Sequence, residues 1–200
     1  MKKISHIALF VFLLYCTQIS AQTSNDLSPE ELEIFQTEVK NRVKRFQNYI
    51  TFIGSKKNNI ETKNAYIRQT LKLFIGEGED YKDVHDNIQP AVRMQLSDIR
   101  SRVKRWRKTK QYLYNLTKVS YRELYITWAD VCRVGEFHKV RDGLYVATVY
   151  ISQKFEGVKD NYSVVNYDEK AITVYLEEVV TIAGSRYNIF FGDIEVTESY

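Results

Sequence analysis

Residues 144–155 read LYVATVYISQKF, and residues 170–182 read KAITVYLEEVVTI. Both stretches are rich in β-branched and aromatic residues, and their apolar side chains recur at every second position, as in half-buried β-strands. Residues 124–134 and 186–198 have the same texture. Because turn-forming residues separate the four stretches, the chain beyond residue 122 is predicted to form consecutive antiparallel strands.

The spacing of apolar residues is helical in the first part of the chain. Ser28, Pro29 and Glu31 are the signature of a helix start, with a capping box and a proline at the first helical position. The apolar stripe that follows recurs at steps of three and four residues, which predicts one long amphipathic helix. A second helix is predicted over residues 60–75.

Two shorter elements lie between these helices and the long strands. A short strand is predicted at residues 92–97 and a third helix near residues 109–119, and residues 157–168 are expected to form a long loop within the sheet. The fold class predicted for residues 28–200 is therefore a single α+β domain. Two N-terminal helices, the short strand and the third helix pack in a curved sheet of four to five antiparallel strands.

Composition excludes several classes of protein. The chain has 200 residues, of which 44% are hydrophobic and 27% are charged, so it is neither disordered nor of low complexity. It contains two cysteines, which excludes a disulfide framework and a zinc site built from several thiolates. Packing of an apolar core must therefore hold the fold.

The amino terminus has the pattern of a secretory signal peptide. Lys2 and Lys3 precede an apolar run at residues 7–16, and Ala21 provides a small residue for cleavage. We therefore interpret residues 1–21 as a signal peptide and residues 22–27 as a polar leader. The run is too short to span a bilayer, so no transmembrane segment is expected, and the protein is expected in the periplasm or outside the cell. Lipid anchoring at Cys16 is the alternative.

Three segments together resemble a known superfamily: YVATVYISQKFEG at residues 145–157, KAITVYLEEVV at residues 170–180 and NIFFGDIEVTES at residues 188–199. With two amphipathic helices before them, they resemble the nuclear transport factor two-like (cystatin-like) α+β cone, in particular its secreted bacterial members. The resemblance covers residues 28–198. It implies a curved sheet with a pocket against the helices, and it leaves the function open, because this fold carries isomerases, dehydratases and binding domains.

Alternation along the strands places a few polar side chains on faces that are otherwise apolar. Asp130, Gln153 and Glu178 share their faces with inward residues, and Trp128 lies on the same face as Asp130. Hairpin turns near residues 137–140 and 162–163 would place Asp130 and Glu178 opposite residues 147–148. These four side chains are the candidates for a pocket, in which an inward carboxylate can act as a general acid or base. A solvated or salt-bridged position near the strand ends is the alternative.

A basic segment follows the short strand. Around Trp106, residues 100–110 carry seven basic side chains, which suits a phosphate or another polyanion. The acidic residues 77–86 can instead neutralise the segment within the molecule. The formal charge of the chain is +4, and two of these charges belong to Lys2 and Lys3, so nucleic acid is not expected as a partner. The polyanion candidates are Arg100, Arg102, Lys104, Arg105, Arg107, Lys108 and Lys110.

No catalytic motif accompanies these features, and His85 and His138 stand alone without partners at metal-ligand spacing. No cofactor or metal is therefore expected. The favoured interpretation is a non-catalytic binding or interaction domain of the bacterial cell envelope, for an unassigned protein, small-molecule or glycan ligand. The alternative is a small cofactor-independent enzyme of the isomerase or dehydratase type. A homodimer through the outer sheet face is a further option.

Overall fold

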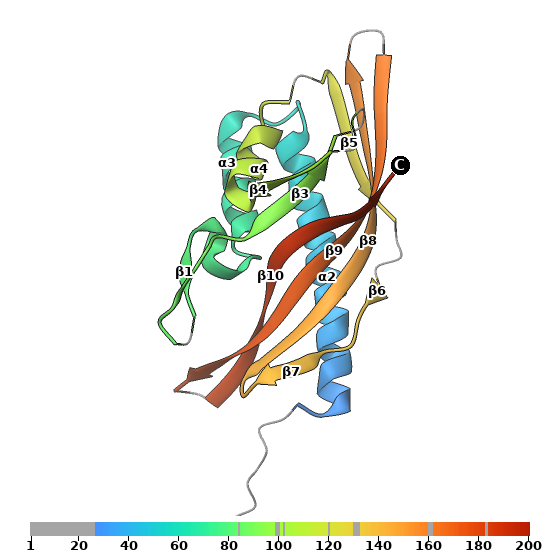
Figure 1. Ribbon diagram of the computed structural model, residues 1–200. Helices are drawn as coiled ribbons and strands as arrows, with labels where there is room; N and C mark the ends of the chain where they lie inside the picture. Colours follow the sequence, from blue (N-terminus) through green and yellow to red (C-terminus); the bar gives the residue numbers. More distant parts are fainter. Residues whose placement is uncertain are drawn as a thin grey trace, which may run out of the picture.

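The computed structural model describes residues 27–83, 85–98, 101, 103–119, 121–129, 133–159, 162–182 and 184–200. In this part of the chain, three α-helices pack against a large sheet that is antiparallel except at one pairing (Figure 1). The predicted α+β class is confirmed. Among the described residues, no helix has the length and apolar character needed to cross a membrane.

Helix α2 (Pro29–Gly54) begins as its sequence predicts. The Ser28 hydroxyl accepts a hydrogen bond from the Glu31 N–H at 3.2 Å, and the Glu31 carboxylate accepts one from the Ser28 N–H at 2.8 Å, which completes the capping box. The side chain of Asn59 caps α3 (Ile60–Leu71) through the Thr62 N–H at 2.8 Å. Four buried apolar residues on one face of α2 are Val39, Val43, Phe46 and Ile50.

Helix α3 ends earlier than the predicted residue 75. The chain beyond Leu71 leaves the helix because Leu73 and Phe74 join the sheet: the Leu73 carbonyl accepts a hydrogen bond from the Phe191 N–H at 2.8 Å, and Phe74 forms an isolated parallel bridge with Phe191. A 3₁₀ turn, η1 (Ile75–Gly78), follows. The predicted third helix is α4 (Thr109–Leu116), which buries Leu113 and Leu116.

The large sheet has the strand order β4-β3-β10-β9-β8-β5, and β6 and β7 pair with β8. In the described part of the chain it has eight strands where four to five were expected, because residues 124–134 contribute β5 and β6, residues 138–141 add β7 and the basic segment adds β4. The strands are β3 (Arg93–Ser97), β4 (Lys104–Lys108), β5 (Glu123–Trp128), β6 (Arg133–Val134), β7 (His138–Arg141), β8 (Leu144–Lys159), β9 (Tyr162–Thr181) and β10 (Gly184–Ser199). A separate pair is β1 (Tyr81–Lys82) with β2 (Ile88–Gln89).

The expected long loop at residues 157–168 is wrong. Strands β8 and β9 stay paired up to Lys159 and Tyr162, so all described residues of that segment belong to the sheet. The first hairpin also turns later than residues 137–140, at Asp142 and Gly143 between β7 and β8. Gly143 has a φ of 69°, which glycine tolerates without strain and which suits a tight hairpin turn.

The apolar side chains of residues 186–198 change parity at Gly192, which indicates a β-bulge, and the structure has one there. The pairing of β10 with β9 shifts between Phe191 and Ile194, and both of these side chains are buried although alternation alone would place them on opposite faces. Alternation fails at the other end of the same hairpin, where Val180 has the parity of the buried Leu176 and is nevertheless 78% exposed. Val180 is the second-last residue of β9 and lies past Leu176, the last buried residue of that strand.

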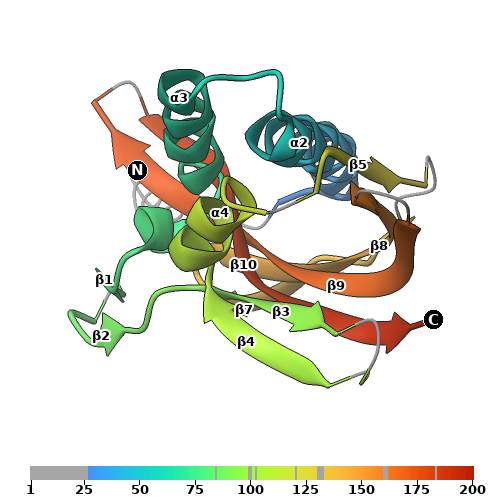
Figure 2. The same ribbon diagram turned by 90° about the horizontal axis from the view of Figure 1, so that it is seen from above.

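All three helices lie on one side of the curved long strands, as Figure 2 shows. The core between these layers centres on Phe46, whose ring contacts those of Phe74, Trp128 and Phe191 at centroid distances of 5.3 to 6.0 Å. The long strands continue past the core, and α4 with β3 and β4 faces that part of the sheet (Figure 2).

Candidate functional site

A cavity of about 740 Å³ lies between α4, the β3–β4 edge and the end of the β8–β9 hairpin. This volume is in the range of small-molecule sites, which run from about 300 to about 1,000 Å³. Half of the residues that line the cavity are aromatic or aliphatic. They are Leu96, Tyr112, Leu116, Val119, Tyr121, Phe155, Tyr162, Val164 and Val165.

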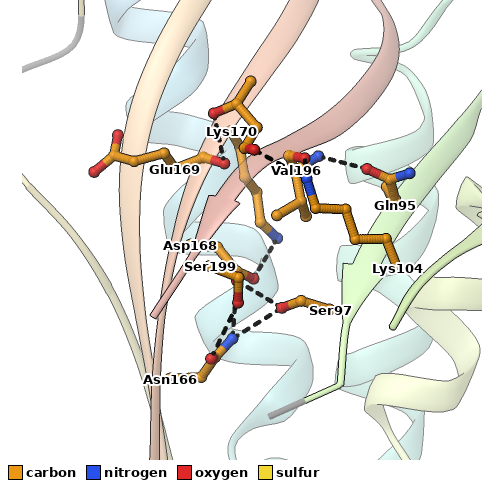
Figure 3. Close-up of polar contacts among 10 residues, drawn as sticks. Gln95, Ser97, Lys104, Asn166, Asp168, Glu169, Lys170, Val196 and Ser199 are labelled. Carbon is orange, nitrogen blue, oxygen red and sulfur yellow. Dashed lines mark hydrogen bonds and ion pairs between the residues drawn. The ribbon is translucent and has the colours of Figure 1, made fainter. Parts of the chain in front are cut away.

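Three consecutive inward positions of β9 carry polar side chains at the floor of this cavity. Asn166, Asp168 and Lys170 are exposed by 7%, 8% and 5%, respectively. Ser97 at the end of β3 donates a hydrogen bond to the Asp168 carboxylate at 2.6 Å (Figure 3). The Asn166 amide donates to the same carboxylate oxygen at 2.9 Å and to the Ser97 hydroxyl at 3.0 Å. We call these four residues the polar floor.

Lys170 and Asp168 form a buried ion pair, with 3.8 Å between Nζ and Oδ2. Burial lowers the pKa of the Lys170 ammonium below its usual value, and the Asp168 charge opposes that shift without cancelling it. The 3.8 Å separation exceeds a normal hydrogen bond, so the ammonium is loosely held. A loosely held amine beside a carboxylate can donate to a ligand or exchange a proton with it.

Tyr112 on α4 and Gln153 on β8 border the polar floor. Burial, with a smaller contribution from the Asp168 charge, raises the pKa of Tyr112 to about 12, so its hydroxyl is a hydrogen-bond donor at neutral pH. Gln153 is directly opposite Asp168 in the β8–β9 pairing and is 5% exposed. Both side chains line the cavity.

Side chains hold the β3–β4 edge of the cavity in place. Strand β3 pairs with β10 only at Met94 and Ile194, a weak backbone link between them. The Val196 N–H donates to the Gln95 side chain at 3.0 Å, and Lys104 Nζ donates to the Val196 carbonyl at 2.6 Å (Figure 3). These bonds fix the wall that carries Ser97 against β10, which pairs with the β9 strand of Asp168.

Of the four side chains expected in a pocket, Gln153 lines this cavity. Trp128 instead packs in the core, edge-on to Phe46 at 5.3 Å, and does not line it. Asp130 lies outside the described residues. The prediction is wrong for Glu178, which does not line this cavity. Its backbone N–H donates to the Gly143 carbonyl, and ten residues of β9, about 33 Å, separate it from Asp168.

The error for Glu178 is one of register. The hairpin was expected to turn near residues 162–163, whereas Lys159 already pairs with Tyr162. This difference moves the position opposite Glu178 by four residues, from 147 to Gly143. Glu178 therefore does not lie opposite residues 147–148, as the predicted cross-strand row required.

Within the described ranges, two of the seven basic side chains of the segment are paired with carboxylates, and a third is bound to backbone carbonyls. Lys108 pairs with Asp80 at 3.5 Å, Lys110 pairs with Glu79, and Lys104 donates to backbone carbonyls of β10. Arg105 is exposed on β4, and Arg107 lines the mouth of the cavity. Arg100 and Arg102 lie outside the described residues, and the described residues contain no cluster of His, Cys, Asp or Glu that could hold a metal.

The outer face of the sheet carries exposed tyrosines, as a binding or dimer surface requires. Tyr125, Tyr150 and Tyr167 are exposed by 39–51%, and the Tyr167 ring stacks on that of Tyr200 at 6.1 Å. This aromatic face is compatible with a protein or glycan partner. Dimerisation through it stays a prediction.

Sequence reasoning missed Ser97, Tyr112, Asn166, Asp168 and Lys170. A usable signal was present for three of them, because stepping back by two from buried Ile172 gives Lys170, Asp168 and Asn166 in turn. The polar composition of residues 157–168 is typical of a loop, and it therefore predicts a loop where the structure has paired strands. Ser97 and Tyr112 gave no such signal, because their place at the cavity depends on tertiary packing.

Comparison with known proteins gives no match: no protein-family model, no curated protein and no solved structure is similar to this chain. The chemistry of the cavity and its polar floor is therefore the basis for assigning a function.

Proposed function

We propose that this protein is a binding domain for a small organic molecule and that the cavity at the β8–β9 end holds it. The observation that carries this proposal is the polar floor, a buried ion pair with two hydrogen-bonding neighbours on the wall of a largely apolar cavity of about 740 Å³. Ligand sites combine an apolar wall with a few convergent polar groups in this way.

The energetics of the polar floor support a ligand. Burying an ion pair costs several kcal/mol of desolvation per ion, and apolar residues of the same volume are often neutral or stabilising in its place. The sequence nevertheless places Asn166, Asp168 and Lys170 at alternate positions inside the sheet, which suits recognition better than stability.

We also propose that the domain is exported and belongs to the nuclear transport factor two-like cone superfamily. Residues 1–21 support export through their basic start, short apolar run and Ala21. The curved long strands with the helices gathered on one side support the cone (Figure 2). In such a fold the open end of the sheet is the natural entrance for a ligand.

Filling the cavity tests the binding proposal. Val164 lines the cavity from β9, and Val164→Trp places an indole there, whereas Val180→Trp makes the same change at an exposed site on the same strand. We expect compounds from a library of uncharged drug-sized molecules to raise the Tm of the wild type and of Val180→Trp, with the shift lost in Val164→Trp. The measurement is a thermal-shift screen of all three proteins. Equal shifts in Val164→Trp, or no shift for any compound, would contradict the proposal.

A second candidate function is catalysis in the same cavity, favoured by the buried Lys170 with its lowered pKa beside Asp168. The amine and the carboxylate are spaced to pass a proton to and from a bound molecule, as isomerases and dehydratases require. Mass spectrometry of a bound compound over time separates the two functions. A binding domain returns the compound unchanged, and an enzyme returns an isomer or a dehydrated product that is lost in Lys170→Met.

A further inference from the structure

Two of the most buried polar side chains at the cavity have no protein partner. The Gln153 amide and the Tyr112 hydroxyl form no hydrogen bond within the part of the chain that the structure describes, although these residues are only 5% and 9% exposed. Their polar atoms stay accessible from the cavity, since the fully buried side-chain atoms without a partner among the described residues are those of Thr109 and Trp128. Both groups line the cavity, so a molecule inside it can supply the missing bonds.

The free groups at the floor are mainly donors. The Tyr112 hydroxyl is protonated at neutral pH, because its pKa is raised to about 12, and the Gln153 amide and the Lys170 ammonium add further N–H donors. The main acceptor, the Asp168 carboxylate, is already engaged by Ser97, Asn166 and Lys170. The Gln153 amide oxygen can also accept, but the free donors outnumber the free acceptors, so an acceptor on the ligand gains the most hydrogen bonds at the floor.

The charges around the cavity cancel. Among the described lining residues, the charged side chains are Asp168 and Lys170 at the floor and Asp98 and Arg107 at the exposed mouth, two of each sign. A charged group at the floor would face an opposite and a like charge at short range, and it would gain little for the desolvation it costs. The balance favours an uncharged ligand.

We propose that the cavity binds an uncharged, largely apolar molecule whose carbonyl oxygen accepts hydrogen bonds from Tyr112 and Gln153. Both donors border Asp168: Gln153 is opposite it across the β8–β9 pair, and the Asp168 charge acts on Tyr112. One acceptor atom between them satisfies both. The aromatic wall of Tyr121, Phe155 and Tyr162 then covers the apolar body of the ligand. This inference rests on the proposed binding function.

A matched pair of dyes tests it. The ketone 6-propionyl-2-(dimethylamino)naphthalene is uncharged and fluoresces according to its surroundings, and 6-propyl-2-(dimethylamino)naphthalene has the same shape without the carbonyl. Fluorescence titration of the wild type should give a Kd for the ketone roughly tenfold lower than for the hydrocarbon, as expected for a ligand hydrogen bond. In Tyr112→Phe and Gln153→Leu the ratio of the two Kd values should fall towards one.

Each other outcome overturns the inference in a distinct way. Equal binding of both dyes to the wild type would leave cavity binding standing and refute carbonyl recognition. Tighter binding of 6-(dimethylamino)-2-naphthoate than of the ketone would refute the uncharged ligand. If neither dye binds the wild type, carbonyl recognition is refuted, and the Val164→Trp screen then shows whether the cavity binds any molecule at all.

Discussion

Phe46→Ala should lower the free energy of unfolding by about 4 kcal/mol, the largest effect of any single side chain in the core. Phe46 is 1% exposed, and its ring contacts Phe74, Trp128 and Phe191, which come from the α3–β1 connection, β5 and β10. Removing it leaves a cavity where the helix layer meets the sheet. Urea denaturation followed by far-ultraviolet circular dichroism measures the change.

Phe52→Ala is the matched control on the same helix. Phe52 is 44% exposed and stacks on Tyr66 alone, at 4.7 Å, so its loss should cost only about 1 kcal/mol. A similar cost for both variants would mean that the layer between α2 and the sheet is not packed as described.

Asp168→Asn should lower the free energy of unfolding by about 3 kcal/mol, because it leaves the Lys170 ammonium buried without a counter-charge. Lys170→Met should also destabilise the protein, by leaving the carboxylate unpaired. The double variant, in which neither charge remains, should recover most of the loss. A double-mutant cycle from urea denaturation gives the coupling between the two side chains. Additive losses would contradict a buried, interacting pair.

The same pair predicts a pH dependence with a definite sign. The pKa of Lys170 is lower in the folded protein than its usual value of 10.5, so between these two pKa values the unfolded chain binds a proton that the folded chain lacks. Stability therefore rises with pH through this interval. The Asp168 charge opposes the lowering of the Lys170 pKa, so Asp168→Asn should lower this pKa further. The pH interval in which stability rises then extends towards neutral pH. Urea midpoints at several pH values should rise more steeply for Asp168→Asn than for the wild type, and Lys170→Met should lack this component.

The fold was predictable where a local rule determined it. The capping box at Ser28 placed the start of α2, and alternation placed Ile172, Val174 and Leu176 in the core. Gly192 marked the β10 bulge because a change of parity needs an extra residue. These features depend on a few neighbouring residues, which the sequence displays directly.

The candidate site was not predictable in the same way, because strand register depends on where a hairpin turns. An error of about two residues in the β8–β9 turn moved the partner of Glu178 by four positions and hid Asp168 in a supposed loop. The inward position of Gln153 was predicted correctly, because alternation along its own strand gives the face of a residue whatever the pairing with the next strand. Tyr112 and Ser97 come from other elements, and only the packing of α4 and β3 against the sheet brings them to Asp168.

A crystal structure of the protein with the naphthyl ketone tests the central claim most directly. The account predicts density for the dye in the cavity at the β8–β9 end, with its carbonyl oxygen within hydrogen-bond distance of the Tyr112 hydroxyl and the Gln153 amide. A cavity closed by its own side chains, or a dye bound only on the outer tyrosine face, would contradict it.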